Sequence, residues 1–295
     1  MTNLTDKFAQ TRLIVNEALS NYLKQKNDLT NRVIEAMRYS AISDGKALRP
    51  FLIFEIGNML NADKKALTVI ACALEMVHTY SLIHDDLPAM DNDDMRRGKP
   101  SNHKQFDEAT AILAGDGLLT KAFEILSDSE IPIEPLTKCQ LICLLANCAG
   151  VNGMIGGQMI DLTGEKQTLS EQDIWQMQSL KTGELIRFAC QAPALLVSAE
   201  QKQYDALTKY ADALGHLFQL TDDLLDVYGN TQIVGKTLHK DKKAQKSTYL
   251  SLNGEAQTRQ KMNKLVEQAH QALSIFGNEA QSLQDLIILI LNREK

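Results

Sequence analysis

Two short aspartate-rich segments are the residues best suited to chemistry in this 295-residue chain. The first, from Asp85 to Asp91, reads Asp-Asp-Leu-Pro-Ala-Met-Asp, and the second, from Asp222 to Asp226, reads Asp-Asp-Leu-Leu-Asp. Carboxylates crowded so closely repel one another, and bound cations relieve that repulsion. Clusters of oxygen ligands suit hard cations such as Mg²⁺, which keeps several waters and is completed by substrate phosphates. The segments therefore predict Mg²⁺ binding rather than two acidic helix ends that only face solvent.

Two arginines, Arg96 and Arg97, directly follow the first segment. Carboxylates alone do not explain guanidinium groups at this place, whereas an anionic substrate bridged to both metals and arginines does. The combination predicts a Mg²⁺-dependent enzyme that acts on diphosphates. A calcium-binding loop is not indicated, because the D-x-D-x-D-G spacing with a terminal glutamate is absent.

Helix geometry determines which carboxylates can share a metal ion. Asp222 and Asp226 are one turn apart and lie on one helix face, whereas Asp223 points about a quarter-turn away. The pair formed by Asp222 and Asp226 is therefore able to hold one Mg²⁺ ion or two adjacent ones.

The first segment needs a break in its helix before its outer carboxylates can meet. Asp85 and Asp91 would lie about 240° apart around an ideal helix. Pro88 disfavours helical geometry at the residue before it, so we expect the helix to end close to Asp85. The chain must then turn back for the two side chains to converge. The partial negative charge of a helix C-terminus also suits cation binding there.

Further basic residues lie in two other segments of the chain. Residues 45–50 read Gly-Lys-Ala-Leu-Arg-Pro and place Lys46 and Arg49 beside a conformationally permissive glycine at an expected helix start. This segment is not a phosphate-binding P-loop, because G-x-x-x-x-G-K-[ST] does not occur. Five lysines lie within residues 236–246, and most of them are expected to be solvated.

Helical periodicity dominates the chain and places both aspartate segments at the ends of apolar helices. The expected helices begin with one around residues 13–21 and continue with 31–41, 65–84, 107–126, 136–162, 170–199, 202–228, 255–276 and 279–292. Ser170 and Asp173 resemble a capping box at the start of one of them. No alternation typical of strands outweighs this pattern. We therefore expect one all-α domain over residues 1–295.

Composition limits the class of protein. A net charge of -6 argues against general nucleic-acid binding, and 44% apolar residues supply a core. The first residues lack the features of a signal peptide, and no uninterrupted apolar run approaches the length of a membrane span. We therefore expect a cytoplasmic protein without a membrane span. The five cysteines, Cys139 and Cys143 among them, are expected to be buried reduced thiols.

Taken together, these segments resemble the trans-isoprenyl diphosphate synthases, and within them the bacterial farnesyl type, whose first motif has the same D-D-x-x-x-x-D spacing. The likeness covers residues 40–250 and includes Gly45-Lys46, Arg49-Pro50, His78, Leu82 to Asp91, Arg96-Arg97-Gly98, Lys181-Thr182-Gly183, Phe218-Gln219, Asp222 to Asp226, Gly235-Lys236 and Lys246 to Tyr249. Two positions depart from the family pattern. Ala47 stands where arginine is frequent, and Leu250 stands where proline often follows Ser-Thr-Tyr.

The resemblance implies a role for each matched residue. Three Mg²⁺ ions per site would be held on the allylic diphosphate by the aspartates, namely Asp85, Asp86, Asp91, Asp222 and Asp226. The same diphosphate would be gripped by Arg96, Lys181, Lys236 and Lys246. The diphosphate of isopentenyl diphosphate would bind in a metal-free pocket made by Gly45, Lys46, Arg49, His78 and Arg97. The reaction centre would be lined by Thr182 and Gln219, which with Lys181 and Lys236 are the candidate catalytic residues.

The resemblance also implies a fold and a reaction. The fold would be an isoprenoid synthase bundle of ten or more helices around a central cavity, and the protein would be a homodimer. The reaction would join isopentenyl diphosphate to dimethylallyl or geranyl diphosphate and give a C15 product. Geranyl or geranylgeranyl diphosphate synthesis is an alternative. A class I terpene cyclase would need no second diphosphate pocket, and a non-enzymatic partner subunit would not need intact charged motifs.

Two residues before the first aspartate are candidates for limiting product length. Ser81 lies one helical turn before Asp85 on nearly the same face, so geometry favours Ser81 as the residue that faces the growing chain. The family resemblance instead points to Tyr80, because an aromatic residue at that place floors the pocket of the bacterial farnesyl type. Both expectations hold if the small Ser81 leaves room and the Tyr80 ring closes the space below it.

Overall fold

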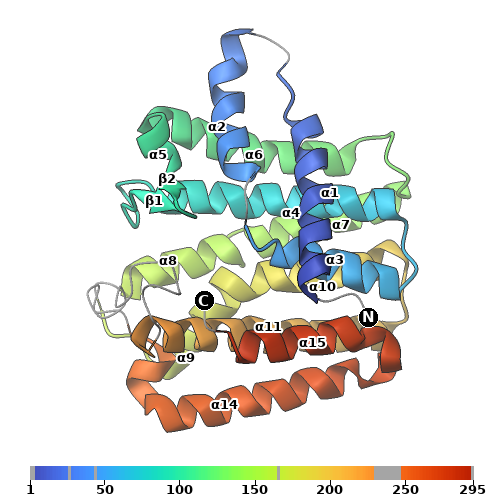
Figure 1. Cartoon of the computed structure of the whole chain (residues 1–295), viewed down its shortest axis with the longest axis vertical. Coiled ribbons are helices and arrows are strands. Elements are labelled where there is room, and N and C mark those ends of the chain that lie inside the picture. The colour runs from blue at the N-terminus through green and yellow to red at the C-terminus, as the bar shows by residue number, and fades with distance from the viewer. Residues whose placement is uncertain (1–3, 26–27, 43–44, 165–166, 229–246, 294–295) are drawn as a thin grey trace. The chain divides into compact units, whose positions relative to one another are not determined.

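The computed structural model describes residues 4–25, 28–42, 45–164, 167–228 and 247–293, and these are predominantly helical (Figure 1). They fall into two compact units. Unit 1 comprises residues 1–143 with 195–197, and unit 2 comprises residues 144–194 with 198–295. Helices α7 (Pro135–Ala149) and α10 (Glu184–Leu196) each supply residues to both units. The all-α class predicted from the sequence is confirmed.

Unit 1 is built around α4. Its elements, in chain order, are α1 (Leu4–Tyr22), η1 (Asp28–Thr30), α2 (Asn31–Ala41), α3 (Leu48–Met59), α4 (Lys64–Asp85), β1 (Met95–Arg96), β2 (Lys99–Pro100), α5 (Asn102–Gln105) and α6 (Glu108–Ser127). Helix α4 is apolar on nearly all sides, and α3 and α6 pack against it (Figure 1). Leu67, Ile70 and Leu74 of α4 are fully buried. The helix starts where Asp63 accepts a hydrogen bond from the Ala66 N–H at 2.9 Å.

Unit 2 is built around α11. Its elements, in chain order, are α8 (Met154–Gly164), α9 (Glu171–Gln178), the π-helical turn η2 (Ser179–Gly183), α11 (Gln201–Tyr228), α14 (Tyr249–Leu273), η3 (Ser274–Ala280) and α15 (Gln281–Leu291). Helices α14 and α15 both pack against α11. The capping box expected at Ser170 and Asp173 is present and starts α9. Helix α11, which carries the second aspartate segment in its last turns, is thus held by packing against two helices.

The structure differs from the expected helices at several places. Helices α1 and α14 begin earlier than expected, at Leu4 and Tyr249, and α3 was not among the expected ranges, although a helix start was expected at residues 45–50. Two other expected helices are interrupted. The segment expected as one helix over 136–162 forms α7 and α8, which are separated by a turn that contains Gly150 and Gly153. The segment expected as one helix over 170–199 is interrupted by the π-helical turn η2. Apolar periodicity continues through both places, so it does not reveal either interruption.

The expectation that all five cysteines are buried is wrong for two of them. Cys139 and Cys143 are exposed on α7, whereas the other three cysteines are buried. Leu141 and Leu145 form the buried stripe of α7. Each exposed cysteine precedes one of these leucines by two positions, which places it about 200° away around the helix.

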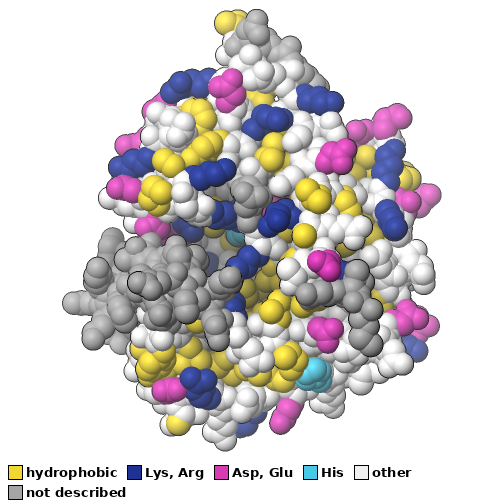
Figure 2. Space-filling model, in the orientation of Figure 1, with side chains coloured by type: hydrophobic (Ala, Val, Ile, Leu, Met, Phe, Trp, Pro, Cys, Tyr) yellow, Lys and Arg dark blue, Asp and Glu magenta, His cyan; other side chains and the backbone are white. Residues whose placement is uncertain are grey.

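Two helical stretches, Lys64–Asp85 and Pro135–Gly164, are long and apolar enough by composition to cross a membrane. Core helices of globular proteins meet the same criterion, and 78% of the apolar window in the first stretch is buried inside the protein. The corresponding share for the second stretch is 33%. On the face shown in Figure 2, acidic and basic side chains are interspersed among hydrophobic ones.

Candidate active site

The first aspartate segment lies at the C-terminal end of α4 in unit 1. The helix ends at Asp85, and the chain turns back through Pro88. The backbone N–H of Asp91 donates to the carbonyl oxygen of Asp85 at 2.9 Å. The expected return of the chain after Pro88 is therefore confirmed, and Asp85 and Asp91 are neighbours although six positions separate them.

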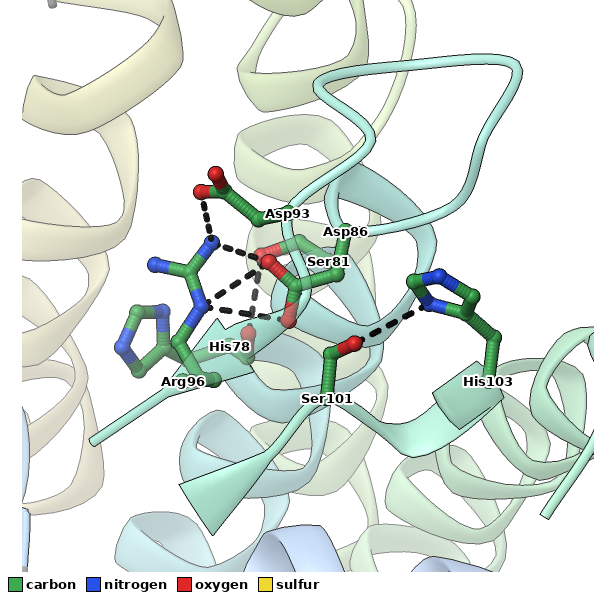
Figure 3. A network of polar contacts seen from close by, with 7 residues as sticks. All are labelled: His78, Ser81, Asp86, Asp93, Arg96, Ser101 and His103. Carbon is green, nitrogen blue, oxygen red and sulfur yellow. Dashed lines mark hydrogen bonds and ion pairs between the residues drawn. The ribbon is translucent and has the colours of Figure 1, made fainter. Parts of the chain in front are cut away.

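Asp86 has a different environment from the aspartates beside it. Its carboxylate is buried and accepts hydrogen bonds from Arg96, including one from Nε at 3.0 Å (Figure 3). Arg96 also lies 3.8 Å from a carboxylate oxygen of Asp93. Burial raises the pKa of the Asp86 carboxyl, the hydrogen bond from Arg96 opposes that rise, and the nearby charges of Asp93 and Asp91 add to it. The structure thus pairs Asp86 with Arg96, two residues predicted to contact metal and diphosphate separately.

A two-residue hairpin separates the two arginines. Strands β1 and β2 pair antiparallel, with Arg96 opposite Lys99. Arg97 and Gly98 form the turn with φ values of 53° and 75°, and two positive φ values are what a tight hairpin turn favours. This hairpin was not expected from the sequence, because Arg-Gly is not one of the dipeptides that signal a tight hairpin turn. Its consequence is that the neighbouring guanidinium groups have different surroundings.

The guanidinium of Arg97 lies against Gly45. A Cβ atom at position 45 would come 2.7 Å from Cζ of Arg97, which is closer than real Cβ contacts allow. Gly45 does not have a positive φ value. Gly45 thus lets the Arg97 guanidinium lie directly against the backbone, and a larger residue would make that side chain shift. Unusual backbone freedom is not the reason for this glycine, which corrects the reason expected from the sequence.

Arg49 and His78 meet in the same part of unit 1. Nη1 of Arg49 lies 3.3 Å from Nε2 of His78, and Lys46 is exposed nearby in sequence. Burial lowers the pKa of Arg49 to about 10, although Glu75 opposes this effect. Burial, together with the charges of Arg49, Arg97 and Arg96, holds the pKa of His78 well below its ordinary value. The imidazole is therefore neutral at neutral pH and able to donate one N–H to an anion.

The two candidates for limiting product length differ in burial. Tyr80 is 6% exposed, its hydroxyl has no hydrogen-bond partner, and its ring lies edge-on to His84. Burial raises the pKa of Tyr80 to about 12. Ser81 is half-buried, and its hydroxyl donates to the carbonyl of His78 at 2.8 Å (Figure 3). The Tyr80 ring is thus enclosed, whereas the Ser81 hydroxyl is satisfied within its own helix.

The second aspartate segment forms the last turns of α11 in unit 2. Asp222 and Asp226 are half-buried, whereas Asp223 is only 3% exposed. Asp223 accepts a hydrogen bond from Nε2 of Gln219 at 3.1 Å, and Oε1 of Gln219 accepts one from Thr182 at 3.3 Å. The two predicted reaction-centre residues, Thr182 and Gln219, are therefore joined in one hydrogen-bonded chain. Asp223 orients that chain, a role that sequence reasoning missed although Asp223 belongs to the motif.

Lys181 lies in the π-helical turn η2. Its Nζ atom is 2.5 Å from a carboxylate oxygen of Asp161 on α8. A Cβ atom at Gly157 would come 2.1 Å from the backbone nitrogen of Lys181. Helix α8 can therefore lie this close to η2 because residue 157 has no side chain. Single π-helical turns inside helices are frequent at functional sites. Asp161 carries no signal in the sequence analysis, because it stands alone in an apolar helix.

These residues of unit 2 line a cleft of about 170 Å³. Its walls are formed by Asp161, Met177, Gln178, Lys181, Thr182, Gln219, Asp223, Ser247 and Thr248. Most of these side chains are polar, so the cleft suits a charged or hydrogen-bonding ligand. The cleft brings together Lys181, Thr182 and Gln219, which the sequence predicted as catalytic.

Asp222 is also contacted from the C-terminal end of the chain. Nη1 of Arg293 lies 2.8 Å from Oδ1 of Asp222. The guanidinium carbon of Arg293 lies 4.9 Å from the centre of the Phe218 ring. A cationic side chain thus lies beside this candidate metal ligand. Its charge reduces the repulsion among the carboxylates of the second aspartate segment.

The donor set of each unit fits Mg²⁺. Within the described part of the chain, no three His, Cys, Asp or Glu side chains are arranged to hold a metal ion by themselves. Mg²⁺ usually takes one or two carboxylates and completes its shell with water and substrate phosphates. Asp85 with Asp91, and Asp222 with Asp226, are each a pair of this kind. Lys236 and Lys246 lie outside the described residues.

Helical units with paired aspartates beside lysine and arginine side chains define a class of enzymes that act on diphosphates. The chain belongs to the polyprenyl synthetase family, whose model matches residues 30–283. It is 40% identical to a farnesyl diphosphate synthase of Micrococcus luteus over 99% of this chain and 100% of that protein. The farnesyl diphosphate synthase of Escherichia coli K12 is 41% identical over 95% of each chain.

Solved structures agree with this assignment. An FPP/GFPP synthase from Zymomonas mobilis, in its apo form, superposes with a TM-score of 0.89 and is 40% identical. The match covers 98% of this chain and 99% of that one.

Proposed function

We propose that this protein is a Mg²⁺-dependent prenyltransferase that condenses isopentenyl diphosphate with dimethylallyl or geranyl diphosphate to give farnesyl diphosphate and pyrophosphate. The observation that carries the proposal is the hairpin of unit 1, which separates two adjacent arginines. Arg96 pairs with Asp86 of the carboxylate segment, whereas Arg97 lies against Gly45. One short segment thus supplies cations to two places, as a reaction between two diphosphates requires.

The residues have separable tasks in this reaction. Magnesium dependence is general in the family, and Mg²⁺ would stabilise the departing pyrophosphate so that the allylic C–O bond ionises. The aspartates would hold three ions, while Lys181 and Arg96 would bind the same diphosphate. Arg49, His78 and Arg97 would hold isopentenyl diphosphate so that its alkene attacks the carbocation. The proton lost in that step would go to pyrophosphate, so no protein nucleophile is needed.

An assay with both substrates tests the proposal. Isopentenyl diphosphate and geranyl diphosphate together should give a C15 product and pyrophosphate with Mg²⁺ present and no product after chelation. A terpene cyclase would consume the allylic diphosphate without isopentenyl diphosphate. A non-enzymatic partner subunit would turn over neither substrate. Product chromatography also separates C15 from C10 and C20 products.

We further propose that the chain acts as one domain over residues 1–295, as a cytoplasmic homodimer without a membrane span. The exposed apolar side chains of Ile112 and Leu113 on α6, which are 44% and 58% exposed, support a dimer. Apolar side chains of this kind are buried at the centre of stable interfaces. Light scattering on the purified protein measures the assembly directly.

The two arginines are expected to serve different substrates. Arg97→Ala should raise the KM for isopentenyl diphosphate by about tenfold, because the lost cation faces the Gly45 and Arg49 region. Arg96→Ala should act chiefly on the KM for geranyl diphosphate and on kcat, because it leaves Asp86 buried without its partner. Steady-state kinetics with each substrate varied in turn measure both effects. Equal effects of both changes on both substrates would contradict this division.

Product length is expected to respond to the two residues before the first aspartate. Tyr80→Ala should lengthen the product towards C20, because it removes an enclosed ring. Ser81→Phe should shorten it towards C10, because a ring would replace a small side chain one turn before Asp85. Chromatography of the products identifies each length. An unchanged C15 product from both variants would place the floor of the pocket elsewhere, for example on α6.

A further inference from the structure

Glu75 is a buried carboxylate that the proposed reaction does not use. It lies in α4 between Leu74 and Met76, one turn before His78, and is 7% exposed. It is the only acidic residue of α4 before Asp85. A buried carboxylate is costly unless nearby cations compensate its charge. The cost of burying the Glu75 carboxylate therefore has to be offset by cations close to it.

The compensating charges come from several elements of unit 1. Burial raises the pKa of Glu75, and the charges of Arg97 and Arg49 oppose that rise. The carboxylate, Gly45 and Arg12 of α1 line one small cavity. On α4 itself, Cys72 and His78 are the titratable neighbours one turn away on either side. Glu75 thus lies near two arginines from different parts of the chain, Arg49 and Arg97, and shares a small cavity with Arg12.

The carboxylate acts on these arginines through charge rather than through a tight two-bond pair. One of its oxygens, Oε2, is buried without a hydrogen-bond partner, and the same is true of Nε of Arg49. Arg97 lowers the pKa of Arg49, as expected for two guanidinium groups that repel one another. A negative charge near both groups reduces this repulsion and allows both to remain in place before an anion arrives.

We propose that Glu75 is a positioning residue for isopentenyl diphosphate, which keeps Arg49 and Arg97 in place for the diphosphate by opposing their mutual repulsion. This inference rests on the proposed function, because it assigns those arginines to that substrate. Without the carboxylate, two guanidinium groups would face each other beside a neutral imidazole. Arg97 lies at the exposed surface, so the repulsion would push its guanidinium towards solvent.

The test is the kinetics of Glu75→Gln, which keeps the shape and removes the charge. The KM for isopentenyl diphosphate should rise about tenfold, while the KM for geranyl diphosphate and kcat stay within about twofold. Glu75→Asp keeps the charge on a shorter side chain and should raise that KM by only about threefold. Thr79→Val is the matched control, because Thr79 is 2% exposed one turn further along α4 and its hydroxyl has no partner. It should leave both KM values unchanged.

An unchanged or lowered KM for isopentenyl diphosphate in Glu75→Gln would overturn the proposal. So would a parallel loss for both substrates and kcat, since that is the mark of a general structural defect. If Glu75→Gln does not fold, Glu75→Asp decides, and an unchanged KM there overturns the proposal. If the wild-type protein shows no prenyl transfer, the proposed function fails separately. Calorimetric titration with inorganic pyrophosphate then decides, and binding to the variant as tight as to wild type would overturn the role of Glu75.

Discussion

Replacing Asp85 with alanine is expected to lower kcat by roughly 10³-fold and to leave the thermal unfolding midpoint nearly unchanged. Asp85 ends α4 as a half-buried residue, and the chain brings Asp91 back beside it. The remaining carboxylates would hold Mg²⁺ less well, so the departing pyrophosphate would lose stabilisation in the transition state. Folding should not suffer, because removing one of several neighbouring negative charges relieves repulsion. Steady-state rates and circular dichroism melting measure the two effects.

Asp94→Ala is the matched control for this change. Asp94 stands in the same loop and is exposed, where it pairs with Lys104 at 2.9 Å. An exposed ion pair of this kind contributes little, so the variant should keep the wild-type rate. A near-wild-type rate for Asp85→Ala at ordinary Mg²⁺ concentration would show that the metal assignment is wrong.

Gly157→Ala is expected to lower kcat/KM for geranyl diphosphate by roughly 10²-fold, because a small displacement of a positioned group costs that much. The new Cβ atom would come 2.1 Å from the backbone nitrogen of Lys181. Backbone atoms cannot rotate away as a flexible side chain does, so η2 must move and carry Lys181 with it. The overpacking should also destabilise the fold by about 1–3 kcal/mol.

Gly183→Ala provides the comparison within the same turn. A Cβ atom there would meet nothing closer than 3.7 Å, which is ordinary contact. This variant should keep the wild-type rate and unfolding midpoint. Wild-type kinetics and stability for Gly157→Ala would show that η2 is not held by close approach of α8.

Much of the helical framework follows from local signals in the sequence. The expected helix over 107–126 matches α6, because Asp107 caps it and the Ser127-Asp128 punctuation ends it. Pro88 sufficed to predict that α4 ends close to Asp85. The end of α11 at Tyr228, just beyond the second aspartate segment, was predicted from helical periodicity. These features depend on residues that are close together in the sequence, so they can be predicted from a single sequence.

Other features depend on side chains that meet only in the folded chain. The pairing of Asp86 with Arg96 requires the hairpin to fold back onto α4. The spacing of these residues along the sequence does not indicate this fold-back. Glu75 has the appearance of a single polar interruption in an apolar helix until Arg49 and Arg97 are placed around it. Asp161 gains significance only through its contact with Lys181. Candidate ligands are therefore visible in the sequence, whereas the residues that orient them are not.

The π-helical turn at residues 179–183 has a consequence for how this segment tolerates changes in length. A π-helical turn holds one more residue than the α-helical turn it replaces, so it is equivalent to a one-residue insertion. Because the widened turn absorbs that extra residue, deleting one residue there should give a continuous α-helix and keep Leu185 and Phe188 of α10, both fully buried, in the core. The deletion would remove the widened turn that holds Lys181. The fold of this segment should therefore tolerate the loss of one residue, whereas the placement of Lys181 should not.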